Sequence, residues 1–160
     1  MAVTSGFYNS IQKDRMYKAE DMNKPYEFLV SNGVFATPDG TPSNYLQVYA
    51  SEGMNVTVKA GRGIFFDKWV VNDADLSLTV DASDVTLNRI DSVVVKVDVS
   101  ETVRAASIYV KKGNTSSSPA APELERNDLI KEYRLANITV NAGVSSITQL
   151  MIEDRRGYTD

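Results

Sequence analysis

The sequence predicts a mainly β domain, namely an antiparallel, jelly-roll-like β-sandwich preceded by an extended N-terminal arm and one short helix. Three observations predict this fold class. After Gly33, apolar and polar residues alternate with a period of two over most of the chain. The alternating runs are short and separated by turn signals such as Ser51-Glu52-Gly53. A helical period occurs only before Gly33. About eight or nine short strands after one helix are typical of packed antiparallel sheets.

The first 17 residues have neither a helical nor a strand period, yet they carry large apolar side chains. These side chains are Phe7, Tyr8, Ile11, Met16 and Tyr17. Two interpretations account for them: the segment lies along its own domain, or it is an arm that docks on a neighbouring subunit. Both interpretations bury the apolar groups.

The segment from Lys18 to Asn32 changes to a helical pattern. Apolar residues recur at spacings of three and four, and Glu20 and Asp21 stand early, where the helix dipole favours acidic groups. The apolar positions are Met22, Tyr26, Leu29 and Val30. Pro25 predicts a kink or a main helix that begins near it, and Asn32-Gly33 predicts the C-cap.

Half-buried strands follow the helix. The alternating runs are residues 46–50, 54–60 and 76–80. The first two flank Ser51-Glu52-Gly53, which predicts a hairpin, and Gly61-Arg62-Gly63 predicts another turn before the next apolar runs.

The most strand-like run, Asp91 to Val99, predicts the central hairpin. It should pair with Arg104 to Lys112 across Ser100-Glu101-Thr102. Two more strands are expected, at Glu132 to Val140 and Ser146 to Glu153, with a Ser/Pro/Ala-rich surface loop before them. The expected organisation is an arm and helix over 1–34, a β-sandwich over 35–155, and a tail or the start of a stalk over 156–160.

Composition excludes several classes of function. The 160 residues carry a formal net charge of −4, and the 17 basic residues are scattered, so nucleic acid is not an expected partner. No apolar run is long enough to span a bilayer, so no membrane insertion is expected. The start lacks the features of a secretory signal, so we expect synthesis in the cytoplasm.

The chain contains no His and no Cys, which argues against an enzyme. No imidazole base, thiol nucleophile or thiolate metal site is possible, and we expect no catalytic residues, no cofactor and no metal. Paired carboxylates are the remaining candidates for catalysis. They are Asp73 with Asp75, Asp81 with Asp84, and Asp98 with Glu101. Each pair stands at a strand end or turn, where Asp is favoured for bonding the local backbone.

Four aromatic residues could form a stacking platform for a saccharide. They are Tyr45, Tyr49, Trp69 and Tyr109. Aromatic residues more often belong to a core or to the interface between subunits, so this is the alternative interpretation.

A series of short segments spread along the chain carries a family resemblance. In order they are SGFYNS, DRMYKAEDM, NGVF, RIDSVVVKVD, VKKG with SSSPAAPEL, and YRLANITVNAGVSSI ending in IEDRR. This series resembles the N-terminal domain of bacteriophage tail and baseplate proteins. The similar families are baseplate upper proteins and the shoulder domains of receptor-binding proteins from phages and prophages of Gram-positive bacteria.

The resemblance implies a structural protein of the virion that anchors the host-recognition apparatus to the tail tip. It implies assembly with other tail or baseplate subunits and with copies of itself, commonly as a homotrimer. Host adsorption would involve cell-surface saccharide only indirectly, through a distal head domain that either is not included in this sequence or is supplied by another chain. The alternatives are a carbohydrate-binding module that contacts the wall saccharide directly and, more remotely, a polysaccharide-degrading tail enzyme that uses one of the Asp pairs.

Overall fold

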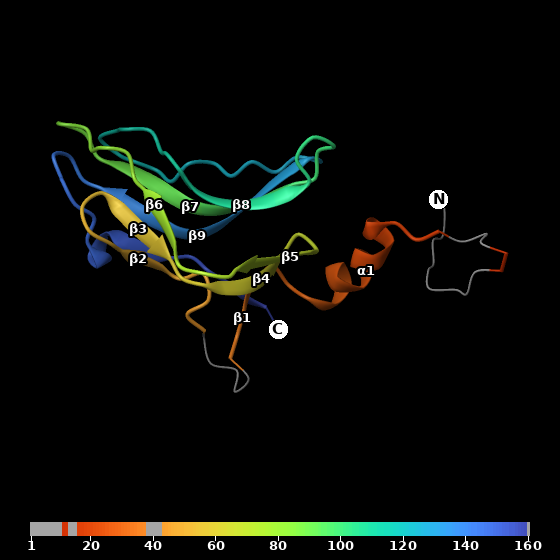
Figure 1. Cartoon of the computed structure of the whole chain (residues 1–160). Helices are drawn as coiled ribbons and strands as arrows, with labels where there is room; N and C mark the ends of the chain where they lie inside the picture. The colour runs from red at the N-terminus through yellow and green to blue at the C-terminus, as the bar shows by residue number, and fades with distance from the viewer. Residues whose placement is uncertain (1–10, 13–15, 38–42, 160) are drawn as a thin grey trace.

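The computed structural model describes residues 11–12, 16–37 and 43–159, and it confirms the predicted fold class of a mainly β chain with one short helix (Figure 1). The elements in chain order are α1 (Ala19–Leu29), β1 (Gly33–Phe35), β2 (Val48–Ala50), β3 (Asn55–Val58), β4 (Gly61–Phe65), β5 (Lys68–Asn72), β6 (Leu76–Thr79), β7 (Arg89–Asp98), β8 (Ala105–Lys111), β9 (Ile130–Val140), the 3₁₀ helix η1 (Gln149–Met151), β10 (Ile152–Asp154) and β11 (Tyr158–Thr159).

The strands form three sheets in two layers. One layer is the sheet ordered β10-β9-β7-β8, and the facing layer contains the sheets β2-β3-β6 and β11-β1-β4-β5 (Figure 1). All pairs are antiparallel except β1 with β11. Among the described strands, the parallel pair is the one exception to the predicted antiparallel arrangement. It also places residues 158–159, expected as a tail or stalk, beside β1.

The predicted central hairpin is confirmed as β7 and β8. Val93 lies opposite Val110 and Val95 lies opposite Ile108, so these side chains share the face toward the core. The predicted hairpin of β2 and β3 is also confirmed, and Gly53 between them has a φ of 66°, which glycine adopts without a steric cost.

One apolar core lies between the layers, built by the strand residues that alternate inward. Its buried members are Val34, Leu46, Val48, Val56, Val58, Phe65, Val70, Val80, Val93, Val95, Val97, Leu135, Ala136, Ile138, Val140 and Ile147. The β-branched residues in this set suit a pleated, buried surface, which is why the period of two located the strands.

The segment Gly61-Arg62-Gly63 is strand rather than the predicted turn. It belongs to β4, and the turn lies at Phe66 and Asp67, whose φ values of 52° and 62° suit a tight two-residue hairpin. The two glycines serve close packing instead. A Cβ on Gly61 would lie 2.5 Å from Tyr45, and one on Gly63 would lie 2.4 Å from the carbonyl oxygen of Gly33.

The helix ends earlier than predicted, and Gly33 is not its C-cap. α1 stops at Leu29, and the C-cap residue is Val30 in an extended conformation. Gly33 lies in β1, where a Cβ would come within 2.5 Å of the Gly157 carbonyl oxygen. Close approach of two chain segments, not a left-handed cap, therefore requires this glycine.

The strand predicted at Ser146 to Glu153 is only partly correct. Residues 149–151 form η1, and the ladder to β9 begins at Ile152, which lies opposite Ile138. Among the described residues, no helix has the length and apolar character needed to cross a bilayer.

Candidate docking surface

The helix α1 is stabilised at its start by local polar contacts. The Asp21 carboxylate accepts a hydrogen bond from the Lys18 backbone N–H at 3.1 Å and pairs with the Lys24 ammonium at 3.3 Å. These contacts lower the pKa of Asp21, with the Lys18 amide as the larger cause. Acidic groups at this position also interact favourably with the positive end of the helix dipole.

Among the described residues, three apolar side chains of α1 are largely exposed. Met22, Tyr26 and Leu29 recur at helical spacing, and they are 52%, 50% and 75% exposed. Figure 1 shows the helix extending from one end of the β layers instead of lying across a sheet. An amphipathic helix normally turns such a stripe toward a core, so this one has the character of a surface that docks elsewhere.

The length of α1 strengthens this conclusion. It has 11 residues and contains Pro25 inside the helix. Helices shorter than about 12 to 15 residues are marginal in water, and an interior proline removes a hydrogen bond. Tertiary packing must therefore supply stability that α1 does not obtain from the sheets of its own chain.

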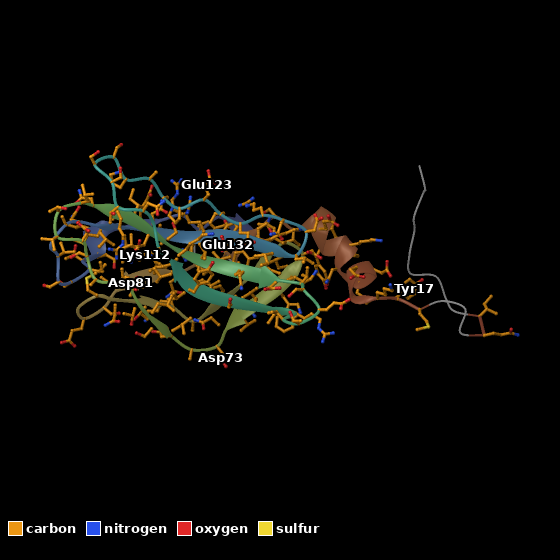
Figure 2. The ribbon with its side chains drawn as sticks, turned by 90° about the horizontal axis from the view of Figure 1, so that it is seen from above. Tyr17, Asp73, Asp81, Lys112, Glu123 and Glu132 are labelled. Atoms are coloured by element: carbon orange, nitrogen blue, oxygen red, sulfur yellow. The ribbon has the colours of Figure 1, made fainter. Side chains whose placement is uncertain are left out.

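The arm residues that the structure describes continue this exposed apolar character. Ile11 and Met16 are 75% and 89% exposed, and Tyr17 is 38% exposed. Figure 2 shows Tyr17 beyond α1, away from the strands. Phe7 and Tyr8 lie outside the described residues.

A second exposed apolar site lies on the edge strand β5. Trp69 and Val71 are 77% and 56% exposed, whereas Val70 between them is buried. The strand alternation explains this, because Val70 points into the core while its two neighbours point to the outer face of the sheet. Arg62 of β4 lies opposite Val71 and is also exposed, so a cation borders the apolar pair.

The four aromatic residues considered for saccharide stacking do not gather on one sheet. Tyr49 belongs to β2 and Tyr45 precedes that strand, Trp69 belongs to β5, and Tyr109 belongs to β8. Tyr45 and Tyr49 each carry a cation over the ring, from Arg62 and Lys59 at 5.8 and 5.9 Å. The hydroxyl of Tyr109 donates to Glu132. Of the four, only Trp69 presents a largely exposed ring.

Four of the acidic residues considered for catalysis hold turns or form ion pairs: Asp84 and Asp98 hold turns, Asp75 pairs with Lys59, and Asp81 pairs with Lys112. Asp84 accepts from the backbone N–H groups of Thr86 and Leu87, and Asp98 accepts from Ser100. These hydrogen bonds lower the pKa of Asp84 and of Asp98. A general acid requires the opposite shift, so the environments favour the structural interpretation.

A cleft is lined by Lys112, the residue that pairs with Asp81. The cleft has a volume of about 450 Å³, and its polar lining includes Asp84, Arg89 and Lys112. The Lys112 ammonium lies 2.8 Å from the Asp81 carboxylate, and this contact lowers the pKa of Asp81 (Figure 2). The Arg89 guanidinium at this site donates hydrogen bonds to Asp91 and to two backbone carbonyl oxygens, so these donor groups already have partners within the protein. Among the described residues, no group of three acidic side chains is placed to hold a metal ion.

Sequence reasoning missed a buried polar cluster on the outer face of the β10-β9-β7-β8 sheet, called the large sheet below because it contains the long strands β7 and β9. Glu132 is 1% exposed and accepts hydrogen bonds from Lys111, Tyr109 and the backbone N–H of Glu125. Arg134 donates to the Pro122 carbonyl oxygen at 2.6 Å. The cluster thus fastens the Ser/Pro/Ala-rich connection across β7 and β9 (Figure 1). Glu132 and Arg134 stand two positions apart on β9, so their side chains share one face of the strand. This repeat of charged residues was the feature of the sequence that could have indicated the cluster.

Comparison with known proteins adds no assignment. The chain matches no family model, no curated protein and no solved structure.

Proposed function

We propose that this chain is a structural protein of a bacteriophage tail or baseplate, an adaptor that attaches the host-recognition apparatus to the tail tip. Its work is done by surfaces that bind other subunits, not by catalysis. The observation that carries the proposal is the exposed apolar stripe of α1, which has the character of an unfilled protein–protein interface. The family resemblance supplies the identity of the assembly.

The body of the protein supports this role in two ways. The core joins both layers, so the body is suited to hold a fixed geometry. The long connection over the large sheet is fastened by Glu132 and Arg134, which makes the body rigid on that side as well. A rigid body with an exposed apolar helix is what an adaptor requires.

Labelling of particles tests the proposal. The full chain, carrying an epitope tag, is expressed in a host bacterium during production of the phage, and phage or tail particles are purified and decorated with gold-conjugated antibody. The label is expected at the tail tip. A variant with Met22→Ser and Leu29→Ser should fold but be lost from the particles, whereas Val85→Ser should be retained, since Val85 is a loop residue that is 87% exposed. Particles that never contain the chain would overturn the proposal.

A direct saccharide-binding role is the second candidate, and the exposed ring of Trp69 favours it. An indole face accessible to solvent can stack on a sugar ring, although no other aromatic residue of the four shares its sheet. Saturable binding to a glycan array that disappears in Trp69→Ala would support this role. Absence of binding by the wild-type chain would remove it.

A further inference from the structure

We propose that α1 of one copy packs on the outer face of β5 in a second copy, covering Trp69 and Val71 there. The proposal rests on the proposed function, in that it names the partner of the α1 stripe as the chain itself. It is an exchange of one element between copies, a frequent route to oligomers.

The first argument is that the apolar side chains of α1 and those of the outer face of β5 are both exposed in a single copy, so neither surface covers the other. Leu29 and Trp69 are 75% and 77% exposed, so the helix does not cover the indole of its own copy. Only residues 30–32 connect α1 to β1. The side chain of Asn32 also accepts a hydrogen bond from the backbone N–H of Phe66, which fastens this connection to the β4–β5 turn. From this end of the body the helix extends outward instead of lying across a sheet (Figure 1).

The second argument is the area of the two surfaces. Five large apolar side chains contribute, and each is between 50% and 77% exposed. They are Met22, Tyr26, Leu29, Trp69 and Val71. Together they present on the order of 600 Å² for burial in each copy. A standard interface buries about 800 Å² per partner, so the exchange supplies most of the required area before any arm contact is added.

The third argument is charge. α1 carries Glu20, Asp21 and Glu27 against one Lys24, so it is acidic. The exposed Arg62 lies beside Val71 on the receiving face. Opposite charges at the rim of an apolar contact favour the correct partner and orientation.

A second copy is the occupant that satisfies both surfaces together. If each copy donates α1 and receives another, every apolar stripe and every β5 face is covered in a closed assembly. A different protein would have to supply one partner for the helix and another for the sheet.

Light scattering and sedimentation equilibrium on the full chain test the proposal. The wild type should form a closed multimer that dissociates on dilution. Trp69→Ser, which removes an aromatic anchor, should weaken assembly about thirtyfold, and Leu29→Ser should weaken it as well. Val85→Ser is the control and should assemble like the wild type, because it removes an exposed valine outside both surfaces. A monomeric wild type, or undiminished assembly of Trp69→Ser, would overturn the proposal.

Disulfide trapping gives a second readout that does not depend on weakened assembly. The chain has no Cys, so Glu27→Cys and Arg62→Cys, at the charged rim of the contact, can be made in separate copies and mixed while Leu29 and Trp69 stay in place. A disulfide should form between the two different copies, and an unlinked mixture would contradict the packing. A monomer that still enters tail particles would contradict this inference and leave the proposed function intact. A multimer that is absent from tail particles would contradict the proposed function and leave the packing of α1 on β5 intact. A monomer that binds saccharide through Trp69 would support the carbohydrate-binding candidate instead.

Discussion

The backbone N–H of Glu125 donates to the buried carboxylate of Glu132 at 2.7 Å, and this bond joins the long connection before β9 to the outer face of the sheet. The same carboxylate pairs with Lys111 at 2.6 Å and accepts from the hydroxyl of Tyr109. One side chain on β9 therefore holds both the edge strand β8, which lies on the far side of β7, and the loop that covers the sheet.

Replacing Glu132 with Gln should destabilise the fold by about 2 kcal/mol, because a buried charged acceptor with three donors is lost. The midpoint of urea unfolding measures the effect. Glu123→Gln is the matched control, since Glu123 is exposed on the same connection and should change the midpoint little (Figure 2). Equal midpoints for the two variants would contradict the role given to Glu132.

Acid should destabilise the wild type more than it destabilises Glu132→Gln. Burial alone would raise the pKa of Glu132, but the hydrogen bonds from Lys111, Tyr109 and Glu125 outweigh it and hold the pKa below its ordinary value. A carboxylate with a lowered folded pKa stabilises the protein fully above its unfolded pKa of about 4.3, and this contribution is lost as the pH falls through the folded pKa. Unfolding midpoints measured downward from neutral pH check the prediction, and identical pH dependence in both proteins would contradict it.

The sequence predicted the strands well because each buried face repeats with a period of two. Val93, Val95 and Ile108 were assigned to the correct side of the correct hairpin on that ground alone. The Glu132 cluster could not be predicted in the same way. Its burial depends on the connection of residues 112–129 crossing the sheet, and local sequence does not encode that path.

Gly113→Ala should destabilise the fold by about 3 kcal/mol, because the new Cβ would lie 2.0 Å from the Ile90 carbonyl oxygen. The backbone N–H of Gly113 also donates to Asp91 at 2.8 Å, so the segment cannot move away freely. Gly143→Ala is the comparison. Gly143 has a φ of 70° with open space around it, so only the backbone cost of about 1 kcal/mol applies. Thermal unfolding should rank the two variants in that order, and the reverse order would contradict the close approach.

Arg89→Lys should cost about 3 kcal/mol, because an ammonium cannot reproduce the planar set of donors. The Arg89 side chain is 2% exposed, lies 3.0 Å from Asp91, and also donates to the carbonyl oxygens of Asp81 and Ala82. Arg155→Lys is the control, since its ion pair with Glu153 is exposed and should contribute little. Similar urea midpoints for the two variants would show that Arg89 does not organise this end of the fold.

The glycines show why the turns were harder to predict than the strands. Gly33 and Gly63 were expected at a cap and a turn, yet both lie in strands, where another backbone segment approaches too closely for a side chain. The sequence identifies a position that requires glycine, but the reason for the requirement lies in segments distant along the chain. The candidate docking surface was predicted to a similar extent. The sequence shows the helical period of α1, but it does not show that the apolar side chains of the helix are exposed.

Hydrogen exchange at α1 tests most directly the claim that this protein works through surfaces that assembly covers. The helix has 11 residues, contains Pro25 and lies against no sheet of its own chain, so it should exchange rapidly in a monomer. We expect the α1 amides to be protected in the concentrated wild type, to lose protection on dilution, and to stay unprotected in Trp69→Ser. Exchange at α1 that is the same at every concentration and in both proteins would contradict the account.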